Sequence, residues 1–200
     1  GLCFDKDKNV GNGRIILFVG RLDEIKGLNY LIHAFRHIAD KYADIRLVVA
    51  GDGDFQLYLS QCRDLQGRVS FLGKVSSSEV EDVYRSAYIG VMPSFHEQCS
   101  YTAIEMMRHK IPLIGTDTTG LAEMLDATPE LRVSIDEDNM MDEEFTERLV
   151  SCLNLLLSDE DAYQRAADAV GKLYEARYKV SDMVHATCGV MESSWDRPDY

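Results

Sequence analysis

The feature that most constrains this chain is a regular alternation of short apolar runs with longer segments of helical spacing. Residues 14–20, RIILFVG, form a continuous apolar run that ends in glycine, which predicts a buried strand. Residues 27–42 then repeat apolar side chains at the spacing of one helix face. The same alternation predicts five more strands, namely IRLVVAGDG, RVSFLG, YIGVMPS, IPLIGT and a weaker LRVSI. The predicted intervening helices are FQLYLSQCRDLQG, ended by Gly67, then SSSEVEDVYRSA, SYTAIEMMRHK and GLAEMLD, and residues 142–195 are predicted as further helices.

Strands that alternate with helices form right-handed βαβ units, whose parallel sheet is covered on both faces. We therefore predict an α/β fold with a single Rossmann-like, doubly wound sheet of about six strands and a helical C-terminal tail. The expected boundaries are a linker or truncated start at 1–13, one domain at 14–178, and a C-terminal helix at 179–200. In such sheets ligands bind beyond the carboxyl ends of the strands.

Charge and cysteine usage narrow the functional classes. A formal net charge of −13 argues against binding to nucleic acid or to anionic membranes. Neither a signal peptide nor an apolar run of the ~20 residues needed for a membrane span is visible. The cysteines are odd in number, far apart and never in a CxxC pair, which favours a cytoplasmic protein without disulfides or structural zinc. They are Cys3, Cys62, Cys99, Cys152 and Cys188.

The loop after the first strand, GRLDEIKG, carries two cations just before a helix. Arg21 offers a fork of donors, Lys26 a mobile charge, and the helix its free N–H groups, which together suit a phosphate. A solvated loop with two ordinary cations explains the pattern about as well. The next loop, AGDGDF, has Gly51 and Gly53 but no third glycine, so a nicotinamide-type site is disfavoured and a tight turn needing positive φ is expected.

The stretch SFHEQCSYTAIEMM places two carboxylates around a predicted helix start. Ser100 and Thr102 are suitable N-cap residues, and the first N–H groups of the helix would face the loop. Glu97 precedes the helix. Glu105 lies about one turn inside it, next to apolar residues, where we expect partial burial. A buried carboxylate needs a hydrogen-bond donor, and sugar hydroxyls are suitable donors. An exposed glutamate on a polar stripe is the alternative.

Cys99 beside His96 is not expected to be a nucleophile, because no third residue that would orient the pair is indicated. A free cysteine more often packs as a small apolar group. The histidines His33, His37, His109 and His185 lack metal-ligand spacing, so no metal site is predicted.

Five motifs occur in a fixed order: GRLDEIKG, AGDG, VSFLGKV, PSFHEQCSYTAIEMM and PLIGTDTTGLAEML. Together they resemble the C-terminal, donor-binding domain of GT-B glycosyltransferases of group 1 (family 4), over roughly residues 15–126. The resemblance implies one half of a GT-B fold. The partners that it implies are a nucleotide-diphosphate sugar, as substrate rather than cofactor, and an N-terminal acceptor domain of the same enzyme.

The resemblance also implies roles by position. Arg21 and Lys26 match the residues that hold the diphosphate, together with Gly20 and the amides of Ser100 and Tyr101. Glu97 and Glu105 match the family's E-x7-E pair, in which the first glutamate contacts the donor sugar in catalysis and the second the ribose. Backbone around Gly73, Lys74 and Val75 matches the region that borders the base. Such enzymes need no metal, and most retain the anomeric configuration.

The sequence departs from the family pattern after the first glutamate. Gln98-Cys99-Ser100 stands where Gly-Phe-Gly is usual, and the resulting ExCxxT spacing is similar to that of bacterial starch and glycogen synthases. We expect a donor half that is inactive alone. A GT-B nucleotide-sugar epimerase, or a non-enzymatic module that binds a nucleotide or a partner, are the alternative functions.

Overall fold

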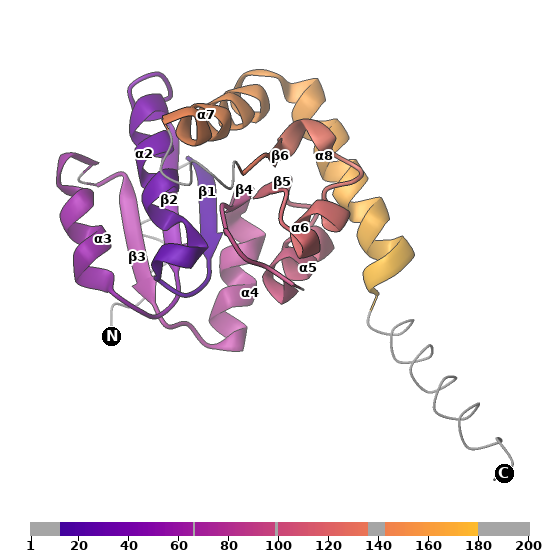
Figure 1. Ribbon diagram of the computed structural model, residues 1–200, viewed down its shortest axis with the longest axis horizontal. Coiled ribbons are helices and arrows are strands. Elements are labelled where there is room, and N and C mark those ends of the chain that lie inside the picture. The colour runs from indigo at the N-terminus through magenta and orange to yellow at the C-terminus, as the bar shows by residue number, and fades with distance from the viewer. Residues whose placement is uncertain (1–12, 66, 99, 136–142, 180–200) are drawn as a thin grey trace, which may run out of the picture.

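The computed structural model describes residues 13–65, 67–98, 100–135 and 143–179. Its centre is a six-stranded sheet of order β3-β2-β1-β4-β5-β6, in which every neighbouring pair runs parallel (Figure 1). The predicted doubly wound parallel sheet is therefore confirmed. Its strands are β1 (Arg14–Val19), β2 (Ile45–Ala50), β3 (Val69–Gly73), β4 (Ala87–Met92), β5 (Leu113–Thr116) and β6 (Arg132–Val133).

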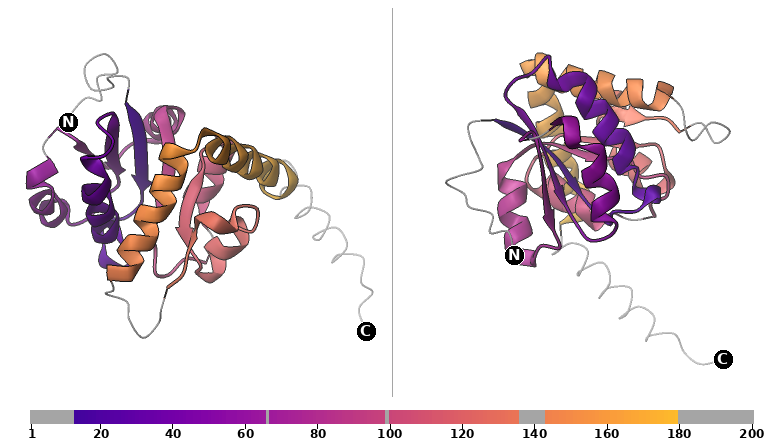
Figure 2. Two further views of the ribbon diagram at one scale, coloured as in Figure 1. Left: turned by 90° about the horizontal axis from the view of Figure 1, so that it is seen from above. Right: turned by 90° about the vertical axis from the view of Figure 1, so that its left-hand side faces the viewer.

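Helices cover both faces of the sheet, because alternate side chains along a strand point to opposite sides. In β1, Ile16 and Phe18 belong to one apolar cluster and Ile15 and Leu17 to the other. The right-hand view of Figure 2 shows α2 and α4 on opposite sides of the sheet. The α-helices are α2 (Leu28–Ala39), α3 (Phe55–Gln61), α4 (Ser77–Ser86), α5 (Tyr101–Arg108), α6 (Thr119–Met124), α7 (Glu143–Ser158) and α8 (Glu160–Leu173).

Short turns complete the chain between these elements. Three are 3₁₀ turns, η1 (Glu24–Lys26), η2 (Arg63–Leu65) and η3 (Pro129–Leu131), and a π-helical turn, η4 (Tyr174–Tyr178), follows α8. The first of them, η1, begins the connection from β1 to α2 and holds one of the predicted site cations.

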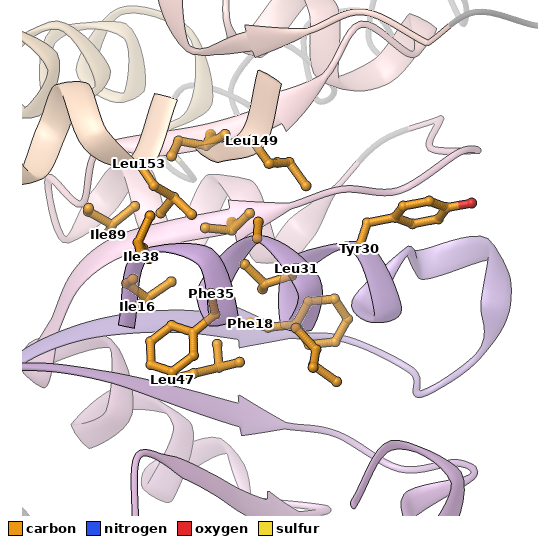
Figure 3. Packing of buried hydrophobic residues seen from close by; sticks show 14 of the residues in the cluster. Ile16, Phe18, Tyr30, Leu31, Phe35, Ile38, Leu47, Ile89, Leu149 and Leu153 are labelled. Carbon is orange, nitrogen blue, oxygen red and sulfur yellow. The ribbon is translucent and has the colours of Figure 1, made fainter. Parts of the chain in front are cut away.

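The larger cluster is built around α2, which lies between the sheet and α7. Figure 3 shows Leu149 and Leu153 of α7 pointing toward α2, while Phe35 points toward Leu47 of the sheet. All four side chains are essentially buried. The apolar residues in 27–42 thus pack on two sides of one helix, against the sheet and against α7.

Two predicted boundaries differ from those observed. The sixth strand is only two residues long. The helix after β2 ends at Gln61, not at Gly67, because the chain tightens into η2, and Gly67 follows that turn with φ 77°. The linker predicted at 1–13 and the C-terminal helix predicted at 179–200 lie outside the described residues, apart from Gly13 and Lys179. Within the described part of the chain, no helix has the length and apolarity that a membrane span requires.

Candidate functional site

The strand order reverses between β1 and β4. The chain moves from β1 outward through β2 and β3, then returns to β4 on the other side of β1. The loops that follow β1 and β4 therefore start from adjacent strands, at the carboxyl edge of the sheet, and lead away from each other. This is the position at which open parallel sheets bind ligands, because a crevice forms between the diverging loops.

Glycines line the carboxyl edge of the three strands on one side of that point. The Gly51 N–H donates to the Gly73 carbonyl at 2.9 Å, and a Cβ on Gly51 would lie 1.7 Å from the Gly20 carbonyl oxygen. We call Gly20, Gly51 and Gly73 the glycine edge. The φ angles of Gly51 and Gly53 are 150° and 141°, which confirms the expected turn at AGDGDF.

The loops after β1 and β4 are locked together by main-chain contacts. The Phe95 N–H donates to the Ile25 carbonyl at 2.8 Å. Gly27, with φ 67°, brings the first loop so close that a Cβ there would lie 2.1 Å from the Pro93 carbonyl oxygen. The Phe95 ring packs edge-on against Tyr30, at 5.3 Å between centroids. The apolar core thus fixes the loop that carries Glu97.

Lys26 and Glu97 meet at this junction. Lys26 Nζ lies 2.5 Å from Glu97 Oε2, and the two side chains are only 18% and 12% exposed. Asp23 caps the turn η1 that holds Lys26, with its carboxylate 3.1 Å from the Lys26 N–H. Burial at this level weakens solvent screening, so the ion pair is a fixed feature of the site and not a loose surface contact.

The start of α5 lies next to Glu97 along the chain. Ser100 is 2% exposed, and its hydroxyl accepts from the Ala103 N–H at 3.2 Å, which confirms Ser100 as the N-cap. Thr102 lies inside the first turn instead. Helix geometry leaves the N–H groups of Tyr101 and Thr102 without carbonyl partners in the helix, so they are available to an anion.

Glu105 differs from expectation in its burial. It is exposed, because the buried face of α5 consists of Ala103, Ile104, Met106 and Met107 and residue 105 falls outside that stripe. A protein side chain that was not predicted donates to it. The hydroxyl of Tyr84, from α4, donates to Glu105 Oε2 at 2.8 Å. Sequence reasoning missed Tyr84, which has the spacing of an ordinary core residue of its helix.

Other predicted site residues are not joined to the Lys26–Glu97 pair. The Arg21 side chain is 74% exposed and lies 3.3 Å from Asp23, so it extends into solvent at the rim. Lys74 is exposed beyond β3, and Tyr101 is 74% exposed at the start of α5. These residues follow β1, β3 and β4 at the carboxyl edge of the sheet, and their side chains are exposed.

A second residue that sequence reasoning did not place in the site is Gly120. Its N–H donates to the Glu97 carbonyl at 3.0 Å, and a Cβ there would lie 2.2 Å from the Gln98 carbonyl oxygen. The start of α6 therefore supports the loop of Glu97 from the other side. Cys99 lies outside the described residues, and the described residues contain no cluster of His, Cys, Asp and Glu that could hold a metal ion.

Comparison with known proteins gives the family. The sequence model of the family described as glycosyl transferases group 1 matches residues 13–175. An uncharacterised glycosyltransferase of Methanocaldococcus jannaschii is 37% identical over 115 residues, which are 56% of this chain and 29% of that protein. The chain spans less than half the length of the curated relatives that it matches.

Solved structures agree with the observed fold. The C-terminal domain of a group 1 glycosyl transferase (LpcC) from Francisella tularensis matches with a TM-score of 0.73 at 26% identity, over 88% of this chain and 90% of that domain. The pneumococcal O-GlcNAc transferase GtfA, solved with UDP and GlcNAc, matches with a TM-score of 0.81 at 14% identity, over 94% of this chain and 37% of that one. The chain belongs to the group 1 glycosyltransferases and has the fold of the C-terminal half of a GT-B enzyme.

Proposed function

We propose that this chain is the donor-binding half of a glycosyltransferase. It would bind a nucleotide-diphosphate sugar, whose sugar passes to an acceptor held by a second domain. The observation that carries the proposal is the Lys26–Glu97 pair, 2.5 Å apart and mostly buried at the switch point, beside the first N–H groups of α5. The fold match to a transferase solved with UDP and GlcNAc supports the same ligand class.

The roles of the residues follow from their charges and positions. Lys26, helped by Arg21 at the rim and by the Gly20 backbone, neutralises the diphosphate, and the amides of Ser100 and Tyr101 donate to it. Glu97 contacts the donor sugar, and Glu105 accepts the ribose hydroxyls. Backbone at Gly73, Lys74 and Val75 borders the base.

In the transfer step, the bond between the anomeric carbon and the diphosphate oxygen breaks, and its electron pair leaves with the diphosphate. The acceptor oxygen bonds to the same carbon, and its proton is taken up by the departing phosphate. Lys26 and the helix amides stabilise the charge that grows on the leaving group, so the step needs no metal ion. We further propose that the anomeric configuration is retained.

Titration calorimetry with UDP-, GDP- and ADP-sugars tests donor binding. We expect one nucleotide to bind, and Lys26→Met to weaken that binding about tenfold or more through loss of a charge-assisted contact to phosphate. Lys172→Ala removes an exposed lysine of α8 and is the matched control, with unchanged binding expected. Unchanged binding in Lys26→Met, or binding of none of the three donors, would contradict the proposal.

Transfer itself requires the acceptor domain. We expect the 200-residue chain to bind the donor without transferring its sugar, because closure of a partner domain normally completes such sites. Product analysis with the full-length enzyme separates transfer from epimerisation. Sugar transfer by the isolated chain at an ordinary enzymatic rate would refute the assignment as a half-site.

A further inference from the structure

The hydrogen bond between Tyr84 and Glu105 joins two helices at the residue proposed to contact the ribose. Tyr84 comes from α4 and is 1% exposed, whereas Glu105 comes from α5 and is exposed. A buried hydroxyl thus donates, at 2.8 Å, to the carboxylate of a side chain that is otherwise open to solvent. One end of this contact is rigid, and the other would be free to rotate without it.

The Tyr84 ring is itself held from the side. It stacks on the His109 ring, with 5.6 Å between centroids and 26° between planes. His109 Nε2 lies 3.2 Å from Glu81 Oε1, and Arg108 also forms an ion pair with Glu81. Because Glu81 belongs to α4, and His109 and Arg108 to the end of α5, these contacts fix the two helices relative to each other. The phenol therefore cannot follow a moving Glu105.

The chemistry of the contact has one direction. Burial, and then the hydrogen bond to Glu105, raise the pKa of Tyr84, so the phenol keeps its proton and is the donor toward the carboxylate. One lone pair of Glu105 Oε2 is used by Tyr84. Each carboxylate oxygen still has a free acceptor position. A carboxylate fixed in this way suits two adjacent hydroxyl groups, which the ribose of a nucleotide supplies.

We propose that Tyr84 is a positioning residue that orients Glu105 to accept both ribose hydroxyls, and that it thereby makes the site prefer ribonucleotides to deoxyribonucleotides. This inference rests on the proposed function. Without the hydroxyl of Tyr84, Glu105 must be ordered when the nucleotide binds, and immobilising one long side chain reduces affinity between about twofold and tenfold.

The test is a comparison of UDP, GDP and ADP with their 2′-deoxy counterparts by calorimetry on the 200-residue chain. We expect the wild type to prefer the ribonucleotide that it binds. Tyr84→Phe, which keeps the stacked ring, should lose more affinity for that ribonucleotide than for its 2′-deoxy form, which offers Glu105 the 3′-hydroxyl alone. Tyr163→Phe is the control, because Tyr163 is a half-buried tyrosine of α8 that stacks on Tyr88 near the amino end of β4.

Glu105→Ala, which removes the acceptor, completes a double-mutant cycle. If Tyr84 acts through Glu105, Tyr84→Phe has no further effect on the ribose preference in that background. An unchanged preference in Tyr84→Phe, an equal loss for both sugars, or tighter binding would each overturn the inference and leave donor binding intact. Binding of none of the three nucleotides by the wild type would instead reject the proposed function.

Discussion

A single glycine sets the distance between the two loops of the candidate site. Gly27 ends the turn that carries Lys26. Its φ is 67°, an angle that residues with a side chain rarely adopt. It also lies where a Cβ would come within 2.1 Å of the Pro93 carbonyl oxygen. Because the neighbouring atom belongs to the main chain, it cannot move aside without displacing the loop after β4. Lys26 and Glu97 depend on this approach for their contact.

We expect Gly27→Ala to lower the free energy of unfolding by about 2–4 kcal/mol, from backbone strain and overpacking together. Nucleotide affinity should fall as well, because the two loops separate. Gly67→Ala is the matched control: φ there is 77°, but a Cβ at this position would have no neighbouring atom within 4 Å, so only strain of about 1 kcal/mol is expected. Urea unfolding and calorimetry measure both effects. Equal destabilisation by the two substitutions would contradict the inference that a side chain at residue 27 collides with the Pro93 carbonyl.

At the scale of elements, α5 combines a structural cap with a candidate ligand contact. The Ser100 hydroxyl accepts from the N–H of Ala103, which leaves the two preceding amides without a carbonyl partner in the helix. The comparable cap of α8, in which Asp159 accepts from the Ala162 N–H at 2.9 Å, belongs to a helix whose Tyr163 stacks near the amino end of β4. Removing each cap in turn therefore distinguishes an effect on stability from an effect on nucleotide binding.

We expect Ser100→Ala and Asp159→Ala each to destabilise the chain by about 1 kcal/mol through loss of an N-cap. Only Ser100→Ala should also weaken nucleotide binding, because it loosens the turn that presents the amides to the diphosphate. Thermal unfolding and titration of the same preparations distinguish the effects. A loss of affinity in both variants would show that binding merely follows overall stability.

The elements differ in how far their sequence determines them. Strands β1 to β5 are mainly apolar runs, so their positions and parallel arrangement follow from the alternation with helices. The end of α3 at Gln61 does not, because the Gln61 carbonyl accepts from Arg36 Nη2, which lies 25 residues earlier. The E-x7-E spacing likewise predicts one glutamate on each side of a helix start. It cannot predict that Glu105 is exposed, or that Tyr84 donates to it.

At the scale of the whole molecule, two buried thiols couple stability to alkaline pH. Burial raises the pKa of both Cys62, at the end of α3, and Cys152, in α7, to about 11. A raised folded-state pKa means that the unfolded chain loses these protons first. The contribution of the two protonated thiols to the free energy of unfolding is thus complete below the unfolded thiol pKa of about 8.5–9. It is lost as the pH rises from there toward 11.

We expect the free energy of unfolding to fall by roughly 2 kcal/mol between about pH 7 and pH 9.5 on account of the two thiols. Denaturant unfolding under reducing conditions at a series of pH values measures the change. The variant Cys62→Ala/Cys152→Val should have lower stability at neutral pH but a shallower pH dependence. An identical slope in the variant would show that other groups cause the alkaline loss.

The glycine edge has a consequence for how proteins of this design diversify. Gly20, Gly51 and Gly73 meet through main-chain atoms, with no space for a methyl group between the first two. The main-chain surface at this edge of the sheet is therefore the same whichever side chains occupy the rest of the three loops. Under the proposed function, we expect selectivity for one donor over another to rest with the exposed side chains next to it, such as Arg21 and Lys74. Those positions can be exchanged without rebuilding the sheet, which makes them the natural starting point for redirecting the domain to a different donor.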